Sequence, residues 1–127
     1  MASMSKLLAV AVIALLYIVG CGKSPACKPG EVYSVGAGTA RPGTYMVCKV
    51  LVIDEHGIWV AMFKDQFDHR PTMEEASLQT VWIPMLVKPG LWEKDEPRLV
   101  NVVTPTQAEL DHLEKMRPKI LKLYPPK

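Results

Sequence analysis

The chain has 127 residues, and its 15 basic and 13 acidic side chains leave a formal net charge of +2. It has no basic stretch interleaved with aromatic residues, so nothing in it indicates nucleic-acid binding. It also lacks a Gly-x-Ser-x-Gly motif, a phosphate-binding loop motif and a His-x-x-x-His pair, and we therefore expect a protein that is not an enzyme and that uses no cofactor or metal.

The beginning of the chain has the features of a secretory signal peptide. One charged residue, Lys6, precedes thirteen consecutive apolar residues, Leu7–Val19. This run fits the apolar region of a signal peptide, which has about 7–15 residues, and is shorter than the roughly 20 residues that a membrane-spanning helix needs. We therefore expect residues 1–20 to be removed, which leaves 107 of the 127 residues.

The residues at the end of this run, Ile18-Val19-Gly20-Cys21, resemble a bacterial lipobox. The resemblance implies cleavage before Cys21, a diacylglyceryl group on its sulfur and an acyl group on its amine, and thus a lipoprotein of the bacterial envelope. In such lipoproteins an Asp at the second mature position favours the inner membrane. Because Gly22 stands there, we expect the periplasmic face of the outer membrane. The alternative is an ordinary signal peptide with a chance cysteine at the cut.

The three cysteines of the chain leave one without a partner if two of them form a disulfide. Lipidation of Cys21 would account for the odd one and leave Cys27 and Cys48 as a candidate pair in an oxidising compartment. Their bridge would close a loop of about 22 residues and stabilise the fold by about 3 kcal/mol. The alternative is that Cys48, which lies in an apolar run, is a buried free thiol.

The mature chain divides into a lipidated tether, residues 21–29, and a single β-rich domain, residues 30–127. Two prolines and the lack of a hydrophobic period predict an extended tether. In the domain, a first strand is predicted over 31–35. The runs Tyr45–Ile53 and Ile58–Phe63, joined by a short turn ending at Gly57, predict a β-hairpin.

Both faces of the second hairpin strand are apolar, which an edge strand packed on one side would not show. We therefore expect the hairpin to lie centrally in a curled sheet or to have its second face covered. The polar segment 65–71 predicts a loop, and Thr72 with Glu75 resembles a capping box for a short helical turn. Val81–Ile83 predicts a strand, which Pro84 restricts to an edge or an end of the sheet.

The last part of the chain predicts a short strand at 91–92, a final strand over 99–103 and a C-terminal helix. Thr106 and Glu109 form a capping-box pattern at the start of this helix, and Thr104 with Gln107 is an alternative that places Pro105 at the first helical position. Leu110, Leu113 and Met116 follow at helical spacing and predict its buried stripe, and Pro118 is expected to end or kink it.

Together these elements predict an α+β fold. We expect a curled, mostly antiparallel sheet of about five strands, or a small open β-barrel, with the C-terminal helix against it.

The order of these segments resembles, over most of the mature chain, the small immunity domains of bacterial polymorphic-toxin systems. The resemblance implies a β-rich domain with a terminal helix that binds another protein. The chain departs from the pattern around Trp82, where the usual Gly-His pair is missing. The segments that carry the resemblance are Gly30–Val35, Tyr45–Ile53, Ile58–Phe63, Phe67 with Arg70-Pro71-Thr72, Val81–Pro84 and Thr106–Leu110.

We therefore expect two kinds of partner, the membrane through the acyl chains on Cys21 and another protein. The candidate protein-binding residues are four aromatic side chains, Trp59, Phe63, Phe67 and Trp82. If they gather on the surface they favour a protein partner, and if they line a pocket with polar groups they favour a small ligand. The alternatives are a structural or assembly lipoprotein of an envelope machine and a small ligand-binding lipoprotein.

Overall fold

The computed structural model describes residues 27–37 and 41–123 of the chain. The predicted signal peptide of residues 1–20, the lipobox and Cys21 lie outside the described residues. Of the helices in the described part of the chain, none combines the length and the apolar character needed to cross a membrane.

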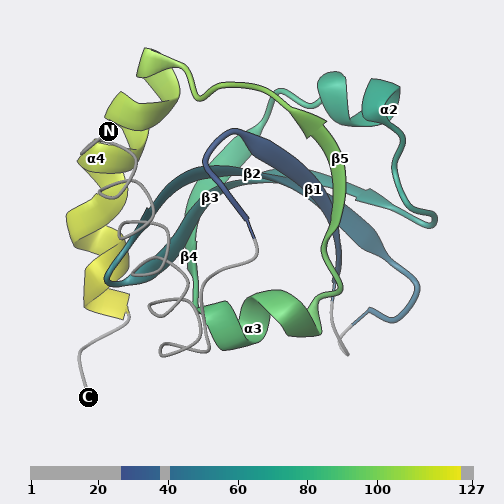
Figure 1. The fold of residues 1–127 in the computed structure, drawn as a ribbon, viewed down its shortest axis with the longest axis horizontal. Helices are drawn as coiled ribbons and strands as arrows, with labels where there is room; N and C mark the ends of the chain where they lie inside the picture. Colours follow the sequence, from purple (N-terminus) through teal and green to yellow (C-terminus); the bar gives the residue numbers. More distant parts are fainter. Residues whose placement is uncertain (1–26, 38–40, 124–127) are drawn as a thin grey trace, which may run out of the picture.

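Five antiparallel strands form one curled sheet in the order β4-β3-β2-β1-β5, which confirms the predicted fold class (Figure 1). β4 and β5 are the two edges, so the sheet is open and does not close into a barrel. The strands are β1 (Glu31–Gly36), β2 (Tyr45–Asp54), β3 (Gly57–Phe67), β4 (Trp82–Val87) and β5 (Arg98–Val102).

The predicted hairpin is the centre of the sheet, and its turn ends at Gly57 as expected. This glycine has a φ of 140°, and a Cβ on it would lie 2.8 Å from the carbonyl oxygen of Val87. A side chain is therefore excluded there by both backbone conformation and space. β3 extends to Phe67, so the prediction that residues 65–71 form a loop is wrong for the first three of them.

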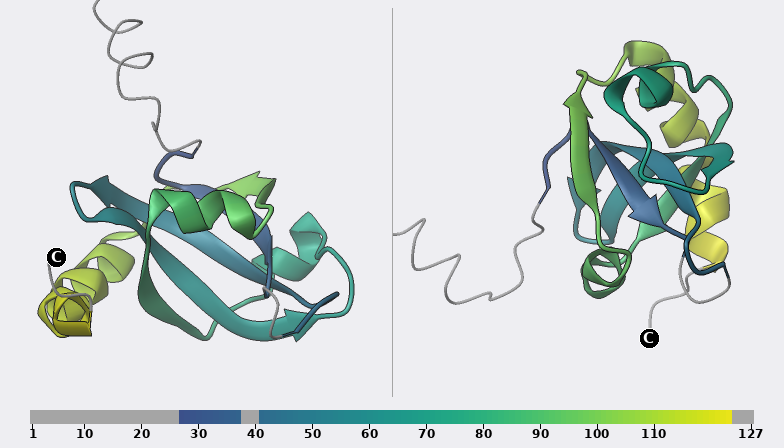
Figure 2. Two further views of the ribbon diagram at one scale, coloured as in Figure 1. Left: turned by 90° about the horizontal axis from the view of Figure 1, so that it is seen from below. Right: turned by 90° about the vertical axis from the view of Figure 1, so that its right-hand side faces the viewer.

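Three helices of the described residues surround the sheet: α2 (Met73–Ser77), α3 (Pro89–Lys94) and α4 (Gln107–Leu123). Alternate residues of β3 meet different helices, because side chains alternate across a strand. Trp59 and Ala61 pack in one cluster with Leu113 of α4, whereas Ile58 and Val60 pack in another with Trp92 of α3. The central hairpin is thus covered on both faces, and α2 and α4 lie at opposite ends of the molecule (Figure 2).

Two predictions in the second half of the chain need correction. Residues 91–92 belong to helix α3 and not to a strand. Pro89 suits the first turn of a helix, and Trp92 is buried with its ring edge-on to Tyr33 at a centroid distance of 5.0 Å. β4 continues through Pro84 to Val87, and it is an edge strand as Pro84 indicated.

Helix α4 begins as predicted but does not end at Pro118. The backbone N–H of Thr106 donates to Glu109 Oε1 at 2.8 Å, and that of Glu109 donates to Thr106 Oγ1 at 3.1 Å, which is the predicted capping box. The helix runs on to Leu123. Pro118 removes one helical hydrogen bond, but Leu113 and Ile120 are buried against the sheet on either side of it and hold both halves in place.

Candidate functional site

The four aromatic residues that the sequence singled out do not form one exposed patch. The side chain of Trp59 is 0 % exposed because it lies beneath α4, so its ring has no surface to offer a partner. Phe63 is buried, whereas Phe67 and Trp82 are half-buried and pack in the same cluster as Phe63. The structure therefore brings Phe63, Phe67 and Trp82 together, and Trp82 also packs against the cluster that holds Trp59 under α4.

An apolar groove of about 240 Å³ borders this cluster at the edge strand β4. Val81 and Ile83 are each 61 % exposed beside it, and Ile83 lies opposite Met62 in the sheet. Such an exposed apolar surface is typical of an interaction site. We call it the methionine groove; its lining residues are Met46, Met62, Phe63, Lys64, Val81, Trp82, Ile83 and Met85.

The free edge of β4 is poorly suited to accept an additional strand. The N–H of Lys64 donates to the carbonyl oxygen of Val81 at 3.0 Å, and the antiparallel register alternates from there. Residues 81, 83 and 85 therefore bond to β3, and the backbone nitrogen of Pro84, a buried residue, lies on the outer side of β4, where it offers no N–H. A partner in the methionine groove would thus bind through side-chain contacts and not by adding a strand to the sheet.

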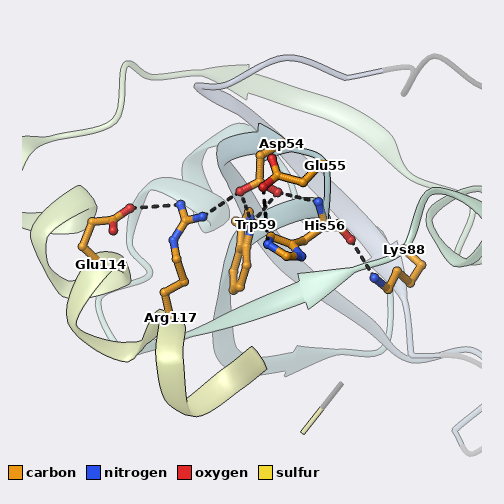
Figure 3. A network of polar contacts seen from close by, with 7 residues as sticks. All are labelled: Asp54, Glu55, His56, Trp59, Lys88, Glu114 and Arg117. Atoms are coloured by element: carbon orange, nitrogen blue, oxygen red, sulfur yellow. Dashed lines mark hydrogen bonds and ion pairs between the residues drawn. The ribbon is translucent and has the colours of Figure 1, made fainter. Parts of the chain in front are cut away.

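A polar network at the turn of the hairpin ties α4 to the sheet (Figure 3). The carboxylate of Asp54 accepts hydrogen bonds from the indole N–H of Trp59 at 2.9 Å, the backbone N–H of His56 at 2.9 Å and Arg117 Nη1 at 2.7 Å. Arg117 also lies over the ring of Trp59, 4.9 Å from its centroid, and pairs with Glu114 at 2.9 Å.

These contacts set the charge state of Asp54. Partial burial raises the pKa of its carboxyl, but the hydrogen bonds from Trp59, His56 and Arg117 lower it by more, so the pKa lies below its usual value. The network therefore holds an ionised carboxylate whose two oxygens are both occupied. We interpret it as the attachment of α4 to the hairpin and not as a catalytic site.

A second polar pair lies on the α4 side of the sheet, between α2 and α4. The side chain of Lys49 is 7 % exposed, and its Nζ donates to Glu109 Oε1 at 2.8 Å and to the carbonyl oxygen of Thr104 at 3.2 Å. Burial raises the pKa of Glu109, but Lys49 and the N–H of Thr106 lower it by more, so it lies below its usual value. This pair borders a cavity of about 320 Å³.

Lys49 was not among the site residues predicted from the sequence, although the sequence carries a signal for it. A lysine that interrupts the apolar run of β2 is unusual, because lysines are almost never fully buried without a partner. The partner, Glu109, was recognised only as part of a capping box. Its second role follows from the tertiary structure, which brings the start of α4 over β2.

Both cysteines of the predicted disulfide lie in the core as free thiols. Cys27 and Cys48 belong to the same buried cluster, on the face of the sheet that α3 covers. Burial raises the pKa of Cys27 to about 11, and burial followed by the nearby Cys27 raises that of Cys48 to about 12. The two side chains thus lie in one buried cluster with thiol pKa values above the usual range, and their pairing stays a prediction.

The polar segment after β3 carries a small charged cluster. His69 contacts Asp68 at 2.8 Å and Glu75 at 2.9 Å, and both hydrogen bonds raise its pKa above the usual value. Within residues 27–37 and 41–123, no group of three or more metal-ligating side chains is arranged to hold a metal ion.

A comparison of the chain with protein-family models, with curated proteins and with solved structures finds no significant match.

Proposed function

We propose that the protein is a lipid-anchored lipoprotein of the bacterial envelope that binds another protein and catalyses no reaction. The observation that carries the binding role is the methionine groove, with Val81 and Ile83 exposed beside it. The resemblance to immunity domains makes an immunity or inhibitor role the specific form of this proposal.

The composition of the groove supports a protein as its occupant. Methionine side chains are flexible and polarisable, and they are favoured at surfaces that adapt to protein partners. Because Pro84 interrupts the outer edge of β4, we expect apolar side chains of the partner to enter the groove.

The position of Cys27 supports a partner that approaches the domain from the membrane side. Cys27 is buried in the cluster against which Met46, Met62 and Met85 pack. Cys27, the first described residue, therefore lies on the face of the sheet on which these three methionines pack. The six residues from Cys21 to Cys27 span at most about 21 Å, so an anchor on Cys21 would keep this face close to the membrane, where we expect the partner.

Site-specific photo-crosslinking in cells tests the binding role. A photoreactive amino acid at position 83 should crosslink to a single membrane-associated protein. The matched control is position 102, because Val102 is 62 % exposed and lies on the opposite edge strand, β5. Replacing Met62 by Glu should abolish the crosslink from position 83 by placing a charge in the groove. Equal crosslinks from positions 83 and 102, or a crosslink that survives Met62→Glu, would refute the groove as the binding surface.

A further inference from the structure

The cavity beside Lys49 lies where neither α2 nor α4 covers the sheet. Alternation along β2 places Lys49 on the same face as Val47, which packs near Ala76 of α2, and Leu51, which packs against Leu113 of α4. The cavity opens between these two contacts. It is lined by Val32, Lys49, Phe63, Ala76, Ser77, Gln79, Asn101, Val103 and Glu109.

The polar end of this cavity presents both a donor and an acceptor. Among the described residues, Lys49 Nζ contacts Glu109 and the carbonyl oxygen of Thr104, which accounts for two of its three N–H donors. The contacts that the Glu109 carboxylate makes within the described residues all fall on Oε1. One ammonium N–H and the second carboxylate oxygen are therefore left for a bound group.

We propose that this cavity binds a small apolar group that carries one neutral hydroxyl, of which phenol is the simplest example. A hydroxyl can accept a hydrogen bond from Lys49 and donate one to Glu109. The body of such a group would contact Val32, Phe63 and Ala76, and Phe63 offers an aromatic ring to an aromatic ligand.

Charged ligands fit this cavity less well. A carboxylate ligand would be attracted by Lys49 but repelled by the carboxylate of Glu109. An ammonium ligand would be attracted by Glu109 but repelled by Lys49. Because the two charges lie 2.8 Å apart, a bound ion would contact its own sign of charge at close range. The cavity volume of about 320 Å³ lies at the lower end of the range for small-molecule sites.

This site is independent of the proposed anchor and lies across the sheet from the methionine groove, with Phe63 as the one residue that borders both. Lys49 lies on the face of the sheet opposite the one on which Met46 and Met62 pack. The phenol hydroxyl has two natural sources, a free small molecule and a tyrosine side chain of another protein. Both present the same chemistry, and a titration with a tyrosine derivative distinguishes them.

Titration of the purified full-length protein with p-cresol, followed by methyl NMR, tests the proposal. We expect saturable shifts of the methyl groups of Val32, Ala76 and Val103. Toluene, which lacks the hydroxyl, and benzoate, which is charged, should each bind at least about tenfold more weakly, because a hydrogen bond to a charged group is worth about that factor or more. Equal binding of p-cresol and toluene, or no saturable shift, would overturn the proposal.

A variant that blocks the cavity without touching the ion pair is the second arm. Val103 lines the cavity and is 45 % exposed, whereas the preceding Val102 is exposed and does not line it. We expect Val103→Trp to abolish p-cresol binding and Val102→Trp to leave it unchanged. Unchanged binding in Val103→Trp would overturn the assignment.

The source of the hydroxyl is tested with N-acetyltyrosinamide in the same titration. Binding at least as tight as that of p-cresol would support the site with a tyrosine of a partner as its natural occupant. Binding of p-cresol alone would support the site with a free small molecule as its occupant.

Discussion

Replacing Arg117 by Met should loosen α4 from the sheet by a measurable amount. The Asp54–Arg117 ion pair is 2.7 Å long, and the two side chains are 16 % and 23 % exposed. Removing one member of a fully buried pair costs about 3–5 kcal/mol, and an exposed pair contributes about 0–1 kcal/mol. Because Asp54 keeps its bonds from Trp59 and His56, we expect Arg117→Met to lower the free energy of unfolding by about 2 kcal/mol.

The measurement is urea denaturation monitored by tryptophan fluorescence, which should report on Trp59 because its ring lies under Arg117. The matched control is Arg98→Met on the exposed edge strand β5, where we expect a change of less than about 0.5 kcal/mol. A double-mutant cycle with Asp54→Asn isolates the interaction between the two side chains. A coupling free energy below about 0.5 kcal/mol would refute the structural role assigned to this pair.

The pH dependence of the same cycle provides a second check. The pKa of Asp54 is lowered in the folded protein, so its stabilising contribution is complete above the unfolded pKa of about 3.9. That contribution is lost as the pH falls through the lower, folded pKa, because folding then no longer favours the ionised form. Asp54→Asn should therefore reduce stability at neutral pH and weaken its decline in acid. An acid decline identical to that of the wild type would contradict this assignment.

Three further predictions follow from other sites. Glu109→Gln should lower the free energy of unfolding at pH 7 by about 2 kcal/mol. Because the pKa of Glu109 is also lowered in the folded protein, the variant should lose less stability in acid than the wild type, and urea titrations between pH 3 and pH 7 measure both effects. Gly57→Ala should cost about 1–3 kcal/mol through its φ of 140° and its contact with Val87, and an unchanged thermal midpoint would contradict this. If Cys27 and Cys48 are reduced, their pKa values of about 11 and about 12 should prevent alkylation of the native protein at pH 8, whereas the protein unfolded in urea should be alkylated. A mass measurement under non-reducing conditions shows whether the two cysteines are bonded instead.

The fold was predictable where one residue fixes the local structure. Gly57 fixes the hairpin turn, and the capping pairs Thr72–Glu75 and Thr106–Glu109 fix the starts of α2 and α4. The errors arose where tertiary contacts decide. α3 is only six residues long, which is too short for a hydrophobic period to predict it. It depends on the burial of Trp92, which is a tertiary contact. α4 continues past Pro118 because the sheet holds the helix on both sides of it.

The candidate site was predictable only in part. The aromatic residues Phe63 and Trp82 were identified because aromatic side chains stand out in a sequence. Both border the methionine groove, but the ring of Trp82 packs on the other face of the sheet, against His112 of α4. The methionines of the groove come from β2, β3 and β4, and only the strand order brings them together. Trp59 was predicted to bind a partner because it is aromatic, but it lies fully buried beneath α4, a helix that begins nearly fifty residues later in the chain.

The most direct test of a lipid-anchored protein that binds its partner at the membrane is to measure the crosslink from position 83 in cells that carry wild-type Cys21 or Cys21→Ala. With Cys21→Ala we predict that the protein leaves the membrane fraction and that the crosslink to the membrane-associated partner is strongly reduced. A Cys21→Ala protein that is still cut after residue 20, stays in the membrane fraction and gives an undiminished crosslink would contradict the account.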